Sequence, residues 1–204
     1  MSTTVQLIDA GTGNLQSVHN ALTNLGAQIV LVSQAVELKK GLRTILPGVG
    51  AFRQFMEGLQ GRGFSEPVHQ IAQSGVPLLG ICVGMQAMFD TGEELGEFSG
   101  LGIIHGKVTR FPDQTSFKVP HTGWNNITAA KPSPLLTGIE DGSYFYFNHS
   151  YYCQPLDDTD TLTLTDYIQP FSSAISRGSV YGVQFHPEKS QKMGQILLNN
   201  FLKL

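Results

Sequence analysis

Residues 77–86 read PLLGICVGMQ. The apolar run at residues 77–81 leads into Cys82, with one glycine two positions before the cysteine and another two positions after it. The pattern predicts a buried strand over residues 77–81, a helix over residues 84–89 and a tight turn at Cys82 between them. It is the thiol counterpart of the Gly-x-Ser-x-Gly nucleophile elbow, in which small flanking residues let the turn project the nucleophile. Unpaired N–H groups at the start of a helix also favour a thiolate. We therefore expect Cys82 to be a nucleophile, against the alternative of a small buried hydrophobic residue.

The segments around this turn alternate between short apolar runs and amphipathic stretches, as in a sheet covered by helices. Beyond residue 103 the pattern changes to extended segments separated by Gly, Pro, Asn and Asp. We expect one domain, residues 1–204, with an α/β architecture: a central mixed, mostly parallel sheet flanked by helices, with additional antiparallel strands. Predicted strands cover residues 5–8, 29–32, 44–46, 104–111, 124–128, 144–147, 161–167, 172–176 and 180–185, and predicted helices cover residues 15–25, 36–40, 66–74 and 191–202.

Composition excludes several classes of function. The chain has 204 residues, 41% of them hydrophobic, and a net charge of -3 without clusters of Lys and Arg, so neither nucleic acid nor an anionic membrane is an expected partner. The first residues do not read as a signal peptide, and no apolar run approaches the ~20 residues of a membrane span, so we expect a cytoplasmic protein. Cys82 and Cys153 lie far apart in different contexts, which argues against a disulfide framework and against a metal cluster. Cys153 is expected to be structural.

A second candidate element follows the apolar run at residues 180–185, where the sequence continues with His186-Pro187-Glu188. A histidine at a strand end can serve as general base, and a carboxylate two residues later can hold its tautomer and stabilise the imidazolium. Taken alone, the segment could equally be a turn and the acidic first turn of the last helix. Because triads are defined by geometry and not by chain order, the combination with Cys82 predicts a Cys-His-Glu triad.

Residues 80–86 (GICVGMQ) together with residues 184–188 (QFHPE) resemble the signature pair of the class I, or triad, glutamine amidotransferases. The resemblance covers essentially the whole chain, including the loop PGVG at residues 47–50. It implies that Cys82 forms a γ-glutamyl thioester, that His186 acts as base and then as acid, and that Glu188 orients His186. Glutamine would be hydrolysed to glutamate and ammonia, and no cofactor or metal is implied.

The same resemblance implies roles for residues around the triad. Backbone N–H groups of Val49 and Val83 would form the oxyanion hole, whose loss typically costs ~10²–10³ in rate. Bound glutamine would be held by a further set of residues, which comprises Gly48, Gly50, Gln86, Ser150 and Tyr151. The alternatives are a polar helix residue for Gln86 and ordinary loop positions for Ser150 and Tyr151.

Three further segments narrow the resemblance: residues 9–14 (DAGTGN), 119–125 (VPHTGWN) and 146–152 (YFNHSYY). They resemble the glutaminase subunits of imidazole glycerol phosphate synthases, which implies a separate cyclase subunit with a (β/α)8 barrel as partner. The chain departs from the usual pattern at Ala10, where an aromatic residue is common, and at Val83, where leucine is common. The glycines in the first segment lack the third glycine of a dinucleotide-binding loop, so no nucleotide site is expected.

A sealed interface with the partner is chemically sensible because ammonia in neutral water mostly becomes ammonium, which is not nucleophilic. Asn14 and Trp124 are the candidates for the docking face, since a lone Trp beside Gly and Asn suits an interface anchor. The alternative for Trp124 is a core strand residue. Rival functions are a stand-alone cysteine hydrolase, an ammonia-supplying subunit of another synthase, and a catalytically silent binding subunit.

Overall fold

The computed structural model describes residues 3–12, 14–114 and 116–204, so Gly13 of the predicted loop lies outside the described residues. Within them, the main element is a 12-stranded mixed sheet, accompanied by a separate ribbon of two strands. The strands are β1 (Thr4–Ile8), β2 (Gln28–Val32), β3 (Arg43–Gly48), β4 (Leu78–Cys82), β5 (Phe89–Gly92), β6 (Phe98–Ser99), β7 (Ile104–Arg110), β8 (His121–Asn126), β9 (Thr128–Ala129), β10 (Tyr144–His149), β11 (Tyr151–Pro155), β12 (Thr161–Asp166), β13 (Pro170–Arg177) and β14 (Val180–Val183).

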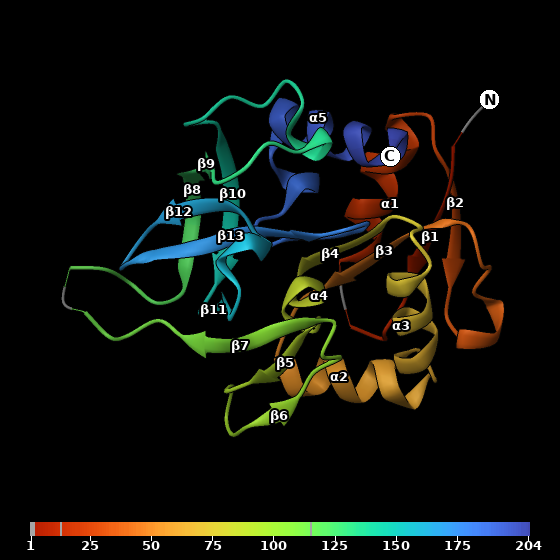
Figure 1. Cartoon of the computed structure of the whole chain (residues 1–204), viewed down its shortest axis with the longest axis horizontal. Coiled ribbons are helices and arrows are strands. Elements are labelled where there is room, and N and C mark those ends of the chain that lie inside the picture. The colour runs from red at the N-terminus through yellow and green to blue at the C-terminus, as the bar shows by residue number, and fades with distance from the viewer. Residues whose placement is uncertain (1–2, 13, 115) are drawn as a thin grey trace.

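One half of the sheet is parallel, in the order β2-β1-β3-β4-β14. Helices α1 (Leu15–Asn24) and α5 (Gln191–Lys203) lie on one face of it, and α2 (Phe52–Gly61) and α3 (Ser65–Gln73) lie on the other (Figure 1). Because both faces are covered, the central strand β4 is buried along its whole length, which explains its continuous apolar sequence. The carboxyl ends of β3, β4 and β14 meet at one edge, where Gly48 pairs with Cys82.

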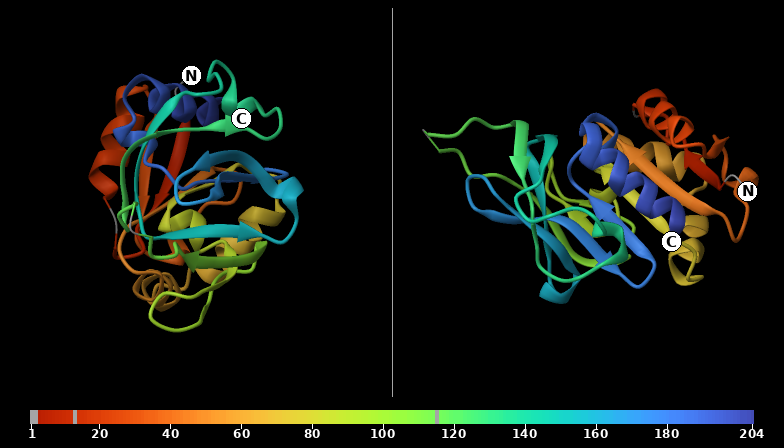
Figure 2. Two further views of the ribbon diagram at one scale, coloured as in Figure 1. Left: turned by 90° about the vertical axis from the view of Figure 1, so that its left-hand side faces the viewer. Right: turned by 90° about the horizontal axis from the view of Figure 1, so that it is seen from above.

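The other half of the sheet is largely antiparallel. It continues from β14 through β13, β11, β7, β5 and β6, while β12 and β9 branch from β13. Strands β8 and β10 form the separate antiparallel ribbon, in which His121 lies opposite His149. This half projects away from the helix-covered half, as the view from above makes clear (Figure 2). The predicted α/β architecture with a mixed sheet flanked by helices is confirmed.

Two predicted helices are wrong in extent. At residues 36–40 there is only the 3₁₀ turn Ala35–Glu37, in which the Glu37 carboxylate folds back to accept from the N–H groups of Ser33 and Gln34. Val36 is 91% exposed, so no buried face extends that turn into a helix. The helix predicted over residues 84–89 is the single turn α4 (Val83–Gln86), because Phe89 instead enters the sheet beside Ile104.

Helix α2 was not among the predicted elements, although its buried residues Phe52, Phe55, Met56 and Leu59 follow helical spacing. Strands β5, β6 and β11 were also not predicted. The remaining helical segments are the 3₁₀ turns Pro134–Leu136, Asp158–Asp160 and Pro187–Lys189. The last of these carries Glu188, the residue predicted to orient His186, and therefore belongs to the site.

Candidate active site

Cys82 ends β4 and immediately precedes α4, in a backbone conformation with φ 54° and ψ -112°. Such a conformation in a residue with a side chain costs about 1–3 kcal/mol and is typical of functional turns. The flanking glycines make the turn possible: a Cβ on Gly84 would lie 1.8 Å from the Leu46 carbonyl oxygen, and one on Gly80 would lie 2.7 Å from the Gly84 carbonyl oxygen. The predicted elbow is therefore present, although the one-turn helix after it leaves little macrodipole to favour a thiolate.

His186 and Glu188 reach the same edge of the sheet from the end of β14. The His186 N–H donates to the Tyr146 carbonyl at 2.8 Å, which anchors the turn to β10. His186 Nδ1 lies 2.9 Å from Glu188 Oε1, and the two side chains are only 3% and 1% exposed. His186 and Cys82 line one pocket of about 260 Å³. Residues from two distant parts of the chain therefore form a buried Cys-His-Glu group.

The electrostatics of this group favour a charged histidine. Burial by itself would lower the pKa of His186, but hydrogen bonds with Cys82 and Glu188 outweigh it and raise that pKa to about 10. An imidazolium at neutral pH is then stabilised on both sides, by the sulfur and by the carboxylate. The other cysteine, Cys153, is 1% exposed, and burial raises the pKa of its thiol well above the usual value, so it has the properties of a structural residue.

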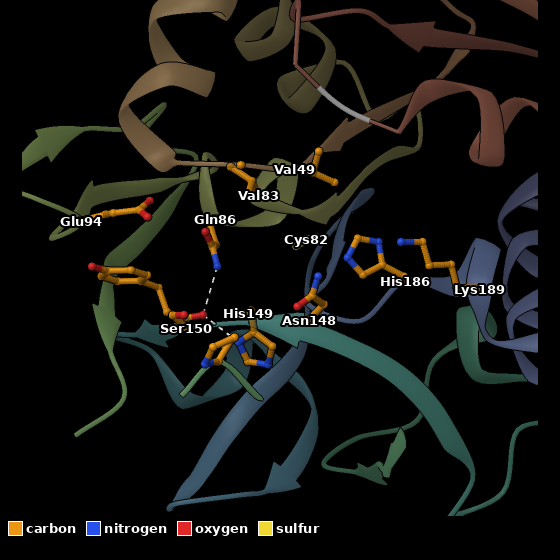
Figure 3. A pocket seen from close by; sticks show the side chains of 13 residues that line it. Val49, Cys82, Val83, Gln86, Glu94, Asn148, His149, Ser150, His186 and Lys189 are labelled. Carbon is orange, nitrogen blue, oxygen red and sulfur yellow. Dashed lines mark hydrogen bonds between the residues drawn. The ribbon is translucent and has the colours of Figure 1, made fainter. Parts of the chain in front are cut away.

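Most of the residues predicted at the oxyanion and at glutamine line the same pocket, which Figure 3 shows from close by. Gly48 is not among the lining residues; a Cβ there would lie 2.7 Å from the Gly84 N atom, so its role is to let β3 approach the elbow. The predicted residues that do line the pocket are Val49, Gly50, Val83, Gln86, Ser150 and Tyr151.

Gln86 is 4% exposed, so its polar side chain is directed into the protein and not into solvent. Its Nε2 donates to the Tyr151 carbonyl at 3.1 Å and to Gln184 Oε1 at 3.1 Å. The first of these bonds appears as a dashed line in Figure 3. Gln86 therefore ties the elbow helix to Tyr151, the first residue of β11, directly after Ser150.

Several lining residues were missed by the sequence reasoning, namely Glu94, Pro120, Asn148, His149 and Lys189. Glu94 follows the unpredicted strand β5, and its Oε2 accepts from the Phe52 N–H at 2.6 Å. In Figure 3, Glu94 and Ser150 lie on one side of Cys82, whereas His186 and Lys189 lie on the other. The sequence around Glu94 contains no signal for this position, but Asn148 and His149 stand directly beside the predicted Ser150.

Neither of the two candidate docking residues is among those that line the pocket. Asn14 precedes α1, and its Oδ1 accepts from Ser17 Oγ at 2.9 Å. Trp124, on β8, is 47% exposed and makes an edge contact with Tyr146, with ring centroids 6.1 Å apart. The alternative of a core residue is therefore wrong for Trp124.

Among the described residues, no group of three or more His, Cys, Asp or Glu side chains is arranged to hold a metal ion. In the same part of the chain, no helix has both the length and the apolar character required to cross a membrane.

Comparison with known proteins places this geometry in a family. Residues 6–204 match the family model described as glutamine amidotransferase class-I. The chain therefore belongs to the class I glutamine amidotransferase family, and it is a glutamine amidotransferase enzyme. The solved structure titled PurLQS from Thermotoga maritima superposes with a TM-score of 0.79 over 100% of this chain and 99% of that chain, at 16% identity, which supports the fold alone.

Two relatives narrow the comparison within the family. Imidazole glycerol phosphate synthase subunit HisH of Desulfitobacterium hafniense (strain Y51) is 46% identical, over 98% of this chain and 93% of the relative. The subunit of the same name from Geobacillus kaustophilus is 45% identical, over 97% of this chain and 95% of the relative.

Proposed function

We propose that this chain is the glutaminase subunit of an imidazole glycerol phosphate synthase and supplies ammonia to a cyclase subunit. The observation that carries the proposal is that Cys82 and His186 line one pocket, while Glu188 Oε1 lies 2.9 Å from His186 Nδ1 behind it. Relatives named as HisH subunits of that synthase, at 45–46% identity, support the choice of complex.

The geometry supports a two-step hydrolysis through a thioester. The Cys82 thiolate attacks the carboxamide carbon of glutamine, and the charge that develops on oxygen meets the N–H groups of Val49 and Val83. The imidazolium of His186 donates its proton to the nitrogen as the C–N bond breaks, so ammonia departs. Neutral His186 then takes a proton from water, whose oxygen attacks the thioester carbon, and the C–S bond breaks to return the thiolate. Glu188 holds His186 through Nδ1 in both steps.

The pocket also has complementary groups for the amino-acid end of glutamine. Glu94 is the carboxylate among its lining residues, and it lies on the same side as Ser150 (Figure 3). We assign the α-ammonium group of glutamine to Glu94, and the remainder of that end to Ser150 and Tyr151. Gln86 shapes this side because its amide nitrogen already binds the Tyr151 carbonyl.

The partner surface we assign to the side that carries Trp124 and Asn14. An exposed Trp is a typical interface anchor, and Tyr144 on the neighbouring strand is 56% exposed. A cyclase subunit with a (β/α)8 barrel that covers this face would receive ammonia without its passage through bulk water. The products of the complex would be imidazole glycerol phosphate and an aminoimidazole carboxamide ribotide.

The test is ammonia release from glutamine by the pure chain, alone and with the cyclase subunit and its ribulose-phosphate substrate. Strong stimulation by the pair is the expected result. Glutaminase activity that ignores this cyclase would keep the triad but assign the ammonia to another synthase. Cyclase binding without any ammonia release would indicate a silent binding subunit and overturn the proposal.

A further inference from the structure

A fully buried glutamine faces the sulfur of Cys82. Gln184 follows β14, is 0% exposed, and its Nε2 lies 3.7 Å from Cys82 Sγ. It is held beside the elbow because β14 pairs with β4, with Val183 opposite Ile81. An amide buried without partners costs free energy, whereas an apolar side chain of similar size would fill the same space without that cost. A buried amide therefore needs a partner for each of its ends, and the sulfur of Cys82 lies beside one of them.

The hydrogen bonds around Gln184 determine which end of its amide faces the sulfur. The Tyr151 carbonyl can only accept, so the amide group of Gln86 that contacts it must be the NH₂ group. The same NH₂ group contacts Gln184 at 3.1 Å, so Gln184 must present its oxygen there. Its NH₂ group is then the end directed at Cys82. In the opposite orientation the amide oxygen would face a thiolate and two NH₂ groups would face each other.

The Tyr151 carbonyl that accepts from Gln86 also accepts from a second set of hydrogen bonds, which runs through two histidines. His149 Nδ1 lies 2.8 Å from the Tyr151 carbonyl oxygen and must donate to it, so a neutral His149 accepts at Nε2. His121 Nδ1 is 3.0 Å from that Nε2 and donates to it, which leaves His121 Nε2 to accept from the Asn125 amide at 3.3 Å.

Backbone groups fix the orientation of Asn125, the last residue of this second set of hydrogen bonds. The Asn125 amide cannot turn over, because its Nδ2 donates to the Asp166 carbonyl at 2.8 Å and its Oδ1 accepts from the Asn126 N–H at 2.8 Å. Asn125 therefore presents an N–H to His121, and a proton on His121 Nε2 would oppose it. Two sets of hydrogen bonds therefore meet at the Tyr151 carbonyl, which accepts from both. One set comes from Asn125 through the two histidines, and the other comes from Gln86, which also donates to Gln184 beside the sulfur.

We propose that Gln184 is a catalytic residue whose amide N–H donates to the Cys82 thiolate, and that Gln86 and His149 are positioning residues that hold this donor in its orientation. The proposal deepens the glutaminase mechanism and rests on it. An N–H donor stabilises an anionic acceptor more than a neutral one, so its contribution is greatest while sulfur is a thiolate. It therefore acts before attack and again when sulfur leaves the thioester carbon.

The reactivity of Cys82 toward iodoacetamide tests the role of Gln184 directly, because alkylation requires the thiolate but not glutamine. The full-length chain is alkylated at pH 7, and the Cys82 peptide is quantified by mass spectrometry separately from the Cys153 peptide. Loss of one donor to a charged group is expected to slow alkylation of Gln184→Met by about tenfold. Gln184→Glu keeps the shape of the side chain but places a carboxylate against the sulfur, so it is expected to react more slowly still.

Gln6→Met is the matched control. Gln6 lies on β1, does not line the pocket, and is also 0% exposed. Its amide nitrogen donates to the Lys39 carbonyl at 2.9 Å. Its loss should destabilise the fold comparably and leave alkylation unchanged. Alkylation of both Gln184 variants at the wild-type rate would overturn the proposal, as would equal slowing in Gln6→Met. If Gln184→Met does not fold, the Gln184→Glu comparison decides.

The positioning role is tested at His149 by rescue. His149→Leu removes the donor to the Tyr151 carbonyl, whereas His149→Asn retains an N–H at nearly the position of Nδ1. We expect slower alkylation and lower kcat in His149→Leu, with most of both restored in His149→Asn. Equal loss in the two variants would show that His149 only fills space. Absence of ammonia release from the wild-type pair would overturn the proposed function instead, so the two failures are distinguishable.

Discussion

His121 and His149 face each other across β8 and β10, with Nδ1 of one 3.0 Å from Nε2 of the other. Both side chains are buried, at 3% and 5% exposure. Burial lowers the pKa of His121 to about 4 and that of His149 to about 3. The hydrogen bonds also indicate that both histidines are neutral, because each ring has one nitrogen that donates and one that accepts.

This pair makes the stability of the protein sensitive to mild acid. An unfolded histidine takes up a proton as pH falls below about 6.5, whereas the folded pair stays neutral until about pH 4. Their stabilising contribution is therefore present above pH 6.5 and is lost as pH falls. We expect the free energy of unfolding to drop by up to about 1.4 kcal/mol per pH unit for each histidine between pH 6.5 and 5.

Urea unfolding at a series of pH values checks this expectation. His186 adds little slope below about pH 5.5, because its folded pKa of about 10 keeps it protonated in the folded state and the unfolded histidine is then mostly protonated too. His121→Phe retains an aromatic ring against Tyr167, which stacks on His121 at 3.9 Å, and removes one titrating group. The free energy of unfolding of His121→Phe should depend less steeply on pH. An unchanged dependence in this variant would contradict the conclusion that His121 is neutral in the folded protein.

Cys82→Ala is expected to abolish ammonia release from glutamine and to leave binding of the cyclase subunit intact. The side chain is 3% exposed and lines the pocket, so its removal deletes the nucleophile with little effect on the outer surface. Ammonia release is followed with a coupled enzyme assay, and complex formation by calorimetry. Turnover that persists in Cys82→Ala would refute the covalent mechanism.

Gly50→Ala tests the loop that carries the Val49 N–H. Gly50 has φ +94°, and a Cβ there would meet no atom within 4 Å, so the substitution changes backbone strain and not packing. A reoriented Val49 amide is expected to lower kcat by about 10²-fold, as for loss of one oxyanion donor. Gly41→Ala is the control, since Gly41 has φ +87° with equally open surroundings, remote from the pocket. Equal kcat values in the two variants would contradict the role of this loop.

Glu188→Gln is expected to lower kcat by about 10³-fold or more, as when the carboxylate of a catalytic triad is neutralised. Because Glu188 helps to raise the pKa of His186, the alkaline limb of the rate profile should also move to lower pH. Steady-state rates across pH measure both effects. Glu57→Gln removes an exposed carboxylate that pairs with Arg53 and should change neither. A pH profile of Glu188→Gln that overlays the wild-type profile would argue against the assignment.

Trp124→Ala is expected to weaken binding of the cyclase subunit by about thirtyfold, the effect of losing one interface anchor. Basal ammonia release by the chain alone should not change, because Trp124 does not line the pocket. Titration calorimetry gives the affinity. Leu156→Ala removes another exposed apolar side chain, 80% exposed, and serves as the control. Undiminished affinity in Trp124→Ala would move the docking face elsewhere.

Local sequence was sufficient for the parts of the site that depend on neighbours in the chain. The glycines around Cys82 indicate an elbow because a Cβ at either position would collide with backbone atoms. The spacing of His186 and Glu188 is short enough for one turn to bring them together. The last helix, α5, was predicted from apolar residues that recur at a regular period, whereas α2 has such a period and was missed. The helix predicted at residues 36–40 does not form, because Val36 is exposed and has no core to face.

Sequence alone therefore determined the fold class and singled out Cys82, His186 and Glu188 as the candidate triad, because strand patterns, turn sterics and contacts between near neighbours are local properties. Only the tertiary structure brought Glu94 into the pocket and joined Gln86 to Gln184, which are separated by 98 positions. Which residues meet across such a separation depends on the order of strands in the sheet, here β14 beside β4. The direction of each hydrogen bond in that chain then follows from the backbone groups at its ends.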